Sequence, residues 1–231
     1  MNRLKLALLG LVTWSIAAPL HAEEITLYSH RHYPSDDALF KRFTEKTGIN
    51  VNVVKAKADE LIERLKAEGE NTPADIFMTA DAGRLERAKA GGLLKAAPST
   101  TLQSRIPSTF RDPDDTWFGF TKRARIIAYA KDRVKPSELS TYEDLMEKKW
   151  KGRILVRSSS NIYNQSLMAS MIAAHGEQKA TEWAGKIRNN MARAPQGSDR
   201  DQMRAVAAGL GDVALVNTYY VGLLLNSSSA K

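Results

Sequence analysis

The sequence predicts an α/β protein made of two similar halves. Apolar runs of strand length alternate with amphipathic runs of helix length, both before residue 95 and after residue 141. This alternation is typical of a parallel sheet covered by helices. Between these parts, residues 95–116 carry three prolines among Ser, Thr and Asp, which indicates a loop or a lobe boundary. We therefore expect two α/β halves joined near residues 117–125.

The first half is expected to contain three strands and three helices. The strands are expected at 25–29, 49–54 and 75–80, and the helices at 35–48, 59–69 and 82–92. Ser35 is the expected N-cap of the first helix. Leu39, Phe40 and Phe43 are expected on the inner face of that helix.

The second half repeats the alternation. Two short extended runs are expected within 117–132, and strands at 153–157 and 212–217. Helices are expected at 141–149, 163–176, 177–190 and 198–211. No short repeat or low-complexity segment interrupts this order.

The first 22 residues have the pattern of a secretory signal peptide. A short basic start precedes an apolar run that ends in small residues, which predicts cleavage after Ala22. A membrane anchor is the alternative, but the apolar run is short for a bilayer span. We therefore expect an exported, soluble protein, located in the periplasm.

Composition excludes several classes of function. The chain has no cysteine, so an exported form has no disulfide and no thiolate metal ligand. Its net charge of +8 is consistent with nucleic-acid binding, but export and the interleaving of acids among the bases argue against that role. No nucleophile elbow, zinc-protease motif or phosphate-binding glycine loop is present, so we expect no enzyme.

Tyrosines gather where three predicted strands end. Tyr33 follows the first strand, Tyr163 follows the strand at 153–157, and Tyr219 with Tyr220 follows the strand at 212–217. Ligands of open α/β sheets bind beyond the carboxyl ends of the strands. Four phenols on three such loops are therefore candidates to meet in a cleft between two lobes.

The remaining three of the seven tyrosines receive structural interpretations. Tyr28 and Tyr129 lie inside predicted strands, where packing is the ordinary role, and Tyr142 lies at a helix start.

Several phenolates together would suit a hard trivalent cation. A phenolate is a hard anionic oxygen donor, so a cluster of them favours Fe³⁺ over Fe²⁺ and over soft metals. Four phenolates leave a ferric cluster with a charge of −1, which Arg123 or Arg31 is placed to offset. His32 is a candidate nitrogen ligand, or a hydrogen-bond donor to a phenolate.

Four stretches resemble a known family. Residues 27–49, 73–94, 153–173 and 211–222 are similar to the periplasmic ferric-iron-binding proteins that serve ATP-driven importers. The likeness is to the tyrosine-ligand branch of cyanobacteria and proteobacteria and extends from residue 25 to about 225. It implies a two-lobed periplasmic binding protein fold of type II, with a cleft between the lobes.

The resemblance also implies site residues and a partner. Tyr33, Tyr163, Tyr219 and Tyr220 match the ligand tyrosines, and His32 matches a histidine that ligates in some members. Arg123 matches an arginine that offsets the phenolate charge. The implied ligand is Fe³⁺, with Fe²⁺ as a second form, and the implied partner is an ABC-type iron permease that receives it from a monomer.

Relatives of this type continue past residue 231, which leads us to expect a C-terminal truncation and an incomplete first lobe. The expected organisation is a signal peptide at 1–22, an N-terminal lobe at 23–120, a second lobe at 121–220 and a truncated return segment at 221–231. Two other functions stay open: the same fold binding an inorganic anion or a polyamine, and a truncated remnant without function.

Overall fold

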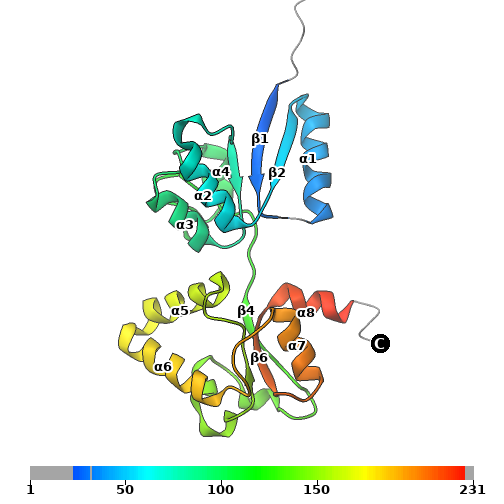
Figure 1. Cartoon of the computed structure of the whole chain (residues 1–231), viewed down its shortest axis with the longest axis vertical. Helices are drawn as coiled ribbons and strands as arrows, with labels where there is room; N and C mark the ends of the chain where they lie inside the picture. Colours follow the sequence, from blue (N-terminus) through cyan, green and yellow to red (C-terminus); the bar gives the residue numbers. More distant parts are fainter. Residues whose placement is uncertain (1–22, 32, 227–231) are drawn as a thin grey trace, which may run out of the picture. The chain divides into compact units, whose positions relative to one another are not determined.

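A computed structural model of the chain (Figure 1) describes residues 23–31 and 33–226. The predicted signal peptide, His32 and residues 227–231 lie outside the described residues. The chain divides into two compact units, one with residues up to Leu61 and Glu70–Met78, the other with Ile62–Gly69 and the residues from Thr79 onward. The lobe limits predicted at 120 and 220 stay a prediction.

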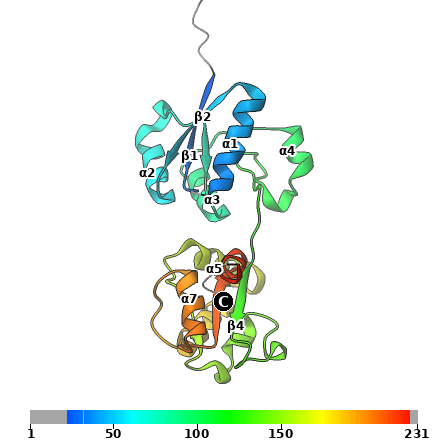
Figure 2. The same cartoon turned by 90° about the vertical axis from the view of Figure 1, so that its right-hand side faces the viewer.

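The first unit is a parallel sheet with one helix beside it. Strands β1 (Glu24–Ser29), β2 (Asn50–Lys55) and β3 (Ile76–Met78) form a sheet of order β2-β1-β3, in which both pairs are parallel. Helix α1 (Pro34–Thr47) lies beside β2 (Figure 2). The three predicted strands and the first helix are therefore confirmed.

Two details predicted for α1 are wrong. Its N-cap is Tyr33 rather than Ser35, because Pro34 supplies the fixed φ angle that favours the first helical position. The helix also has no buried residue: Leu39 is 58% exposed and Phe43 is 38% exposed.

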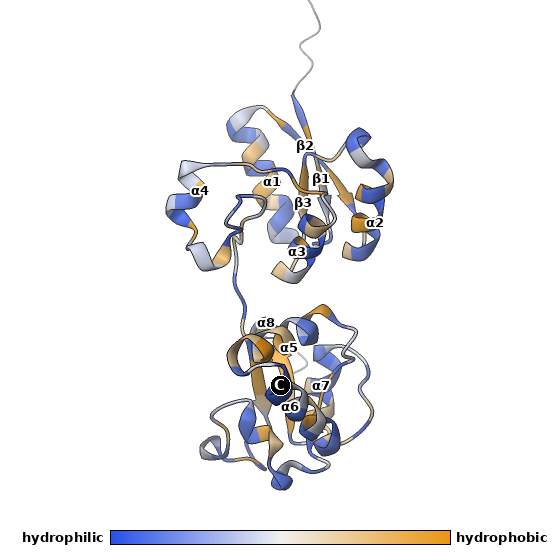
Figure 3. Cartoon of the chain, turned by 90° about the vertical axis from the view of Figure 1, so that its left-hand side faces the viewer, coloured by the Kyte–Doolittle hydropathy of each residue, from blue (hydrophilic) through white to orange (hydrophobic). Residues whose placement is uncertain are grey.

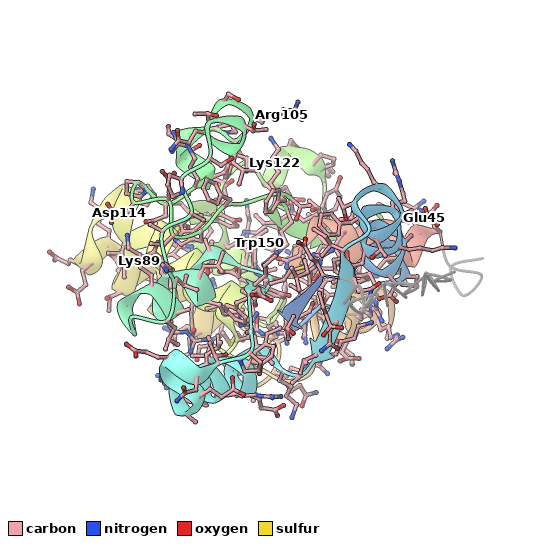
Figure 4. The ribbon with its side chains drawn as sticks, turned by 90° about the horizontal axis from the view of Figure 1, so that it is seen from above. Glu45, Lys89, Arg105, Asp114, Lys122 and Trp150 are labelled. Carbon is pink, nitrogen blue, oxygen red and sulfur yellow. The ribbon has the colours of Figure 1, made fainter. Side chains whose placement is uncertain are left out.

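Helix α2 (Ala58–Glu68) and the 3₁₀ turn η1 (Gly69–Asn71) connect β2 to β3, and α3 (Ala82–Ala90) follows β3. The segment that comes next, before the second sheet, is more ordered than predicted. The stretch predicted as a loop contains α4 (Thr100–Arg105) and η2 (Ser108–Phe110). Lys89 of α3 holds this stretch by donating to Asp112 at 2.6 Å and to Asp114 at 2.8 Å (Figure 4).

The second sheet is mixed rather than parallel. Strands β4 (Arg125–Tyr129), β5 (Ile154–Leu155) and β6 (Val213–Asn217) have the order β4-β6-β5. The β5–β6 pair is parallel as predicted, but β4 is antiparallel to β6, with Arg125 opposite Asn217. An antiparallel edge strand on an otherwise parallel sheet is common.

Four helices accompany this sheet. They are α5 (Ile162–His175), α6 (Glu177–Asn190), α7 (Asp199–Ala207) and α8 (Thr218–Leu225) (Figure 1). Alternate residues of β6 enter two separate cores, because successive side chains of a strand point to opposite faces. Val213 and Leu215 pack in the core with α5 and α6, whereas Ala214 and Val216 pack with α7.

The helix predicted at 141–149 is instead two 3₁₀ turns, η4 (Glu143–Met146) and η5 (Lys148–Trp150), and another turn, η3 (Pro136–Glu138), precedes them. Glu147 adopts an extended conformation between the last two turns, and Trp150 is fully buried in the core with α5 and α6. None of the helices in the described ranges is long and apolar enough to cross a membrane.

Candidate functional site

Three of the four predicted ligand tyrosines lie in the first turns of two helices. Tyr163 is the second residue of α5, and Tyr219 and Tyr220 are the second and third residues of α8. The sequence predicted Tyr163 where a loop meets the helix expected at 163–176, and it predicted a loop for Tyr219 and Tyr220. Both helices begin directly after extended N-cap residues, Asn161 and Asn217. The Asn161 side chain accepts a hydrogen bond from the Tyr163 backbone N–H at 3.0 Å.

The structure brings these three phenols together within the second unit. The hydroxyl oxygens of Tyr163 and Tyr219 are 3.5 Å apart. The rings of Tyr219 and Tyr220 have centroids 4.1 Å apart and planes 39° apart. Adjacent positions on a helix differ by about 100° in direction, so two neighbouring tyrosines can present both rings to one region.

Tyr33 belongs to the other unit. It occupies the N-cap position of α1, and the guanidinium of Arg31 lies 5.3 Å from its ring centroid. Arg31 also donates two hydrogen bonds to Asp36, each of 2.9 Å. His32 lies outside the described residues. The convergence of all four tyrosines and the ligation by His32 therefore stay predictions.

All four tyrosines lie at the start of a helix. The first turn of a helix carries unpaired N–H groups and the positive end of the helix dipole. An anionic side chain is therefore favoured there. These positions would therefore stabilise a tyrosine in its phenolate form.

Arginines surround the phenols of the second unit. Around the Tyr163 ring centroid, guanidinium carbons lie at 4.7 Å for Arg123, 5.6 Å for Arg157 and 5.9 Å for Arg125. The guanidinium of Arg200 lies 5.4 Å from the Tyr220 ring centroid. These positive charges would lower the energy of an anionic cluster of phenolates.

Arg123, the predicted charge-balancing residue, is itself paired with a carboxylate. Its Nη2 lies 3.1 Å from Oδ2 of Asp81, which also accepts a hydrogen bond from the Ser166 hydroxyl at 2.6 Å. Asp81 caps α3 and has a positive φ of 85°. Part of the Arg123 charge is therefore offset by Asp81.

Arg125 lies at the centre of a second polar network. Its Nη1 donates to Asp199 at 2.7 Å and to the Asn217 side chain at 3.1 Å. Its Nη2 donates to the Asn164 side chain at 2.7 Å and to the Leu215 carbonyl at 2.9 Å. The network connects residues that adjoin the tyrosines on both helices.

The environment of Tyr219 favours its neutral form. Burial raises the pKa of the Tyr219 phenol well above its ordinary value, and the hydrogen bonds with Tyr163 and Tyr220 raise it further. At neutral pH this tyrosine therefore keeps its proton.

The donor set determines which cation fits. The three phenols are hard oxygen donors, and no group of three or more His, Cys, Asp or Glu that could hold a metal occurs in the part of the chain that the structure describes. Such a set does not suit soft metals, which prefer thiolate ligands. It also differs from the usual ligands of zinc, which are Cys, His, Asp and Glu. A trivalent hard ion matches both the oxygen donors and their anionic charge.

Sequence reasoning missed four residues of this site: Arg125, Arg157, Asp199 and Asn164. Arg157 ends the strand predicted at 153–157, and Arg125 lies two residues after Arg123. The place of Arg157 at the carboxyl end of a predicted strand, and the closeness of Arg125 to Arg123, could have drawn attention to them. Asp199 had no comparable signal, because it contacts Arg125 across 74 positions of sequence.

Comparison with known proteins places the chain in a family. The family described as Bacterial extracellular solute-binding protein matches residues 71–230. The chain belongs to this family. For a solute-binding protein, a cluster of ligand-type side chains at helix starts is the natural candidate for the solute site.

Named relatives make the likeness specific. The chain is 53% identical over 209 residues to Iron uptake protein A1 of Synechocystis sp., and the match covers 90% of this chain and 58% of that protein. It is 29% identical over 201 residues to the Major ferric iron-binding protein of Neisseria meningitidis, covering 85% of this chain and 59% of that protein.

Solved structures show the same fold. The chain is 56% identical to Trichodesmium FutA (IdiA) in complex with iron and citrate ligands, with a TM-score of 0.86 over 90% of this chain and 66% of that one. These comparisons confirm the predicted α/β periplasmic-binding-protein fold and the resemblance to iron-binding relatives. The chain spans less than three fifths of the length of the curated relatives it matches.

Proposed function

We propose that this solute-binding protein captures ferric iron and delivers it to an ABC-type permease. The observation that carries the proposal is the cluster of Tyr163, Tyr219 and Tyr220, with two phenol oxygens 3.5 Å apart and arginines around them. Two relatives that are 53% and 51% identical over the aligned residues are named as iron uptake proteins. Their names support the choice of iron as the solute.

Charge explains why the ferric ion is favoured. Three phenolates neutralise one Fe³⁺, and Tyr33 as a fourth ligand gives a cluster of charge −1. Arg123 and Arg157 would then offset the extra negative charge. Fe²⁺ has one positive charge fewer, so the same phenolates hold it less strongly. Reduction of the ion is therefore one route of release.

The remaining parts of the proposal concern the location of the protein, its partner and the other unit. We propose a periplasmic monomer that catalyses no reaction and that hands its ion to a permease of the inner membrane. Tyr33 and His32 are the ligands proposed for the other unit. A hinge between two lobes and the limits of those lobes belong to the same proposal.

The test is to titrate the mature protein with ferric citrate and to record its visible spectrum. Phenolate bound to Fe³⁺ gives a coloured ligand-to-metal charge-transfer band. We expect Tyr219→Phe and Tyr220→Phe each to weaken binding and reduce the band, because only the oxygen is lost. Ferric affinity in the double variant equal to that of the unchanged protein would show that these residues are not ligands.

An inorganic anion is the second candidate, because Arg123, Arg125 and Arg157 surround Tyr163. The same arginines argue against a polyamine, which is itself a cation. A protein that stays colourless with ferric citrate but binds phosphate would favour the anion. A folded protein that binds neither would indicate a remnant without function.

A further inference from the structure

A single arginine connects the two helix starts that carry the tyrosines. We propose that Arg125 is a positioning residue that sets the separation of the Tyr163 and Tyr219 oxygens at the metal site. The inference rests on the proposed function, since it concerns the same site. Arg125 itself is not proposed as a ligand, because its guanidinium is a permanent cation.

One branch of the guanidinium fixes the start of α8. Nη1 of Arg125 donates to the side-chain oxygen of Asn217, the N-cap of α8, at 3.1 Å. The same nitrogen lies 2.7 Å from Asp199, which accepts the Asn217 backbone N–H at 2.9 Å. Asn217 is thus held through both its backbone and its side chain, two residues before Tyr219.

The other branch fixes the start of α5. Nη2 of Arg125 donates to Oδ1 of Asn164 at 2.7 Å. The amide nitrogen of Asn164 in turn donates to the carbonyls of Arg157 and Ser158, at 2.8 and 3.3 Å. Asn164 directly follows Tyr163, so this branch holds the first turn of α5 against the segment that leads into it.

Burial makes this bridge rigid. The side chain of Arg125 is 8% exposed and that of Asp199 is fully buried. The planar guanidinium offers donors in fixed directions, and two of its nitrogens serve the two helices at once. A lysine at this position would keep the positive charge but has one nitrogen, so it cannot hold both branches with this geometry.

The opposite end of the same sheet provides a matched comparison. There Arg133 and Arg153 both pair with Asp212, each through Nε at 2.6 Å. Arg133 also donates to the Val206 carbonyl at 2.7 Å. This second Arg–Asp–Arg network has a similar composition, but it lies at the start of β6 and contacts none of the ligand tyrosines.

The experiment compares Arg125→Lys with Arg133→Lys in the full-length mature protein, using ferric citrate as the probe. Circular dichroism and thermal melting check that both variants fold. We expect Arg125→Lys to lower ferric affinity at least tenfold and to shift or weaken the charge-transfer band. We expect Arg133→Lys to retain affinity and spectrum. Equal behaviour of the two variants would overturn the positioning role.

A second substitution covers the case in which Arg125→Lys does not fold. Asn164→Ala removes only the α5 branch and leaves the buried Arg125–Asp199 pair in place. We expect it to reproduce the change in the charge-transfer band. An unchanged spectrum and affinity in Asn164→Ala would contradict the proposal.

A double variant tests whether Arg125 acts through Tyr163. If it does, Arg125→Lys lowers ferric affinity by a smaller factor in the Tyr163→Phe protein than in the unchanged protein, whereas independent effects would add. Tyr219→Phe is included to separate the two proposals. If it leaves ferric binding unchanged, the proposed function fails. If it weakens binding while Arg125→Lys does not, only the positioning role fails.

Discussion

Tyr219 and Tyr220 illustrate how far neighbouring residues can differ in role. In a strand they would point to opposite faces, but in the first turn of α8 both rings lie in one region, with centroids 4.1 Å apart. Tyr220 also packs against the α7 core and lies 5.4 Å from the Arg200 guanidinium. The two adjacent tyrosines therefore lie close together because helix α8 begins one residue before them.

Arg123 and Asp81 should affect metal binding in opposite directions. Removing the cation with Arg123→Ala should weaken ferric binding by about 10- to 100-fold, which corresponds to ~1.4–2.7 kcal/mol and is the size of a Coulomb interaction over several ångströms at an effective dielectric constant of about 20. Asp81→Asn should strengthen binding by less than tenfold, because it removes the carboxylate that offsets Arg123. Competition titration with citrate measures both changes.

The asparagine substitution also serves as the structural control. Asparagine has the same shape as aspartate and its side-chain oxygen can still accept the Gly83 N–H, so the cap of α3 is kept. If both variants weaken binding to the same extent, the charge argument is wrong and the pair acts only by holding the fold.

The Lys89–Asp112 pair predicts an acid-sensitive contact. Burial opposes ionisation of Asp112, but hydrogen bonds from Lys89 and Thr116 outweigh it and lower its pKa from 3.8 to about 2. The pair therefore contributes stability above pH 3.8, and this contribution is lost as the pH falls toward 2. We expect Lys89→Met to lower the melting temperature at pH 6 and to shrink the further loss between pH 4 and 2.

Lys95→Met is a suitable control for that experiment, because Lys95 is exposed. It should leave the acid profile unchanged. A Lys89→Met protein whose melting temperature follows that of the unchanged protein at every pH would rule out the contribution of this contact.

At the residue scale, the sequence points to the tyrosines that the structure brings together, Tyr163, Tyr219 and Tyr220, but not to the residues that hold them in place. The tyrosines could be chosen because they follow strands, which is a local pattern. Arg125 contacts Asp199 and Asn217, which lie 74 and 92 positions later in the sequence. No local sequence pattern predicts contacts between residues so far apart in the chain. The residues that position the tyrosines can therefore be identified only from the folded structure.

Helix α8 offers a test of how firmly the tyrosines are held. It contains only uncharged residues, most of them apolar, and its ribbon has hydrophobic colours in Figure 3. A Cβ added at Gly222 would meet nothing within 4 Å. Gly222→Ala should therefore stabilise the protein by up to about 1 kcal/mol through helix propensity, with ferric affinity maintained. Urea denaturation measures the change.

Gly211 is the contrasting position for the same substitution. A Cβ there would lie 2.8 Å from Cγ of Leu155, which is fully buried, and 3.0 Å from the Arg153 carbonyl. Gly211→Ala should destabilise the protein by about 1–3 kcal/mol, as overpacking does. Equal effects at positions 211 and 222 would show that local space does not decide the outcome.

Element boundaries account for most of the differences between prediction and structure. The helix at 177–190 has a regular amphipathic period and is predicted to the residue. The stretch at 141–149 has helix-forming residues, yet Asp144 accepts the N–H groups of Ser140 and Thr141 and the chain turns in 3₁₀ form. Such competing local hydrogen bonds are difficult to weigh from sequence alone.

At the scale of the whole molecule, the helices differ in how many of their side chains are buried. Helix α1 buries no residue, whereas Leu61 of α2 is fully buried. Leu39→Gln should change the free energy of unfolding by no more than about 0.5 kcal/mol. Leu61→Ala should cost about 2–5 kcal/mol, because it leaves a cavity. Denaturant titrations that gave similar losses for both variants would contradict the exposure of α1.

The broad architecture could be predicted because it follows from composition and order. Strand–helix alternation on both sides of a proline-rich stretch indicates two α/β halves, and both sheets are present. The direction of β4 could not be predicted in this way. Alternation gives the order of elements, but a strand that precedes the repeated pattern can enter a sheet in either direction.

The reversed direction of β4 makes the protein unequally tolerant of insertions. An extra residue between 119 and 122 would lengthen a segment without regular structure and leave the pairing of Arg125 with Asn217 intact. The same residue added between 125 and 126 would displace the guanidinium by one step along the strand and turn it to the opposite side. Length variation among homologues should therefore occur before Arg125 and not after it.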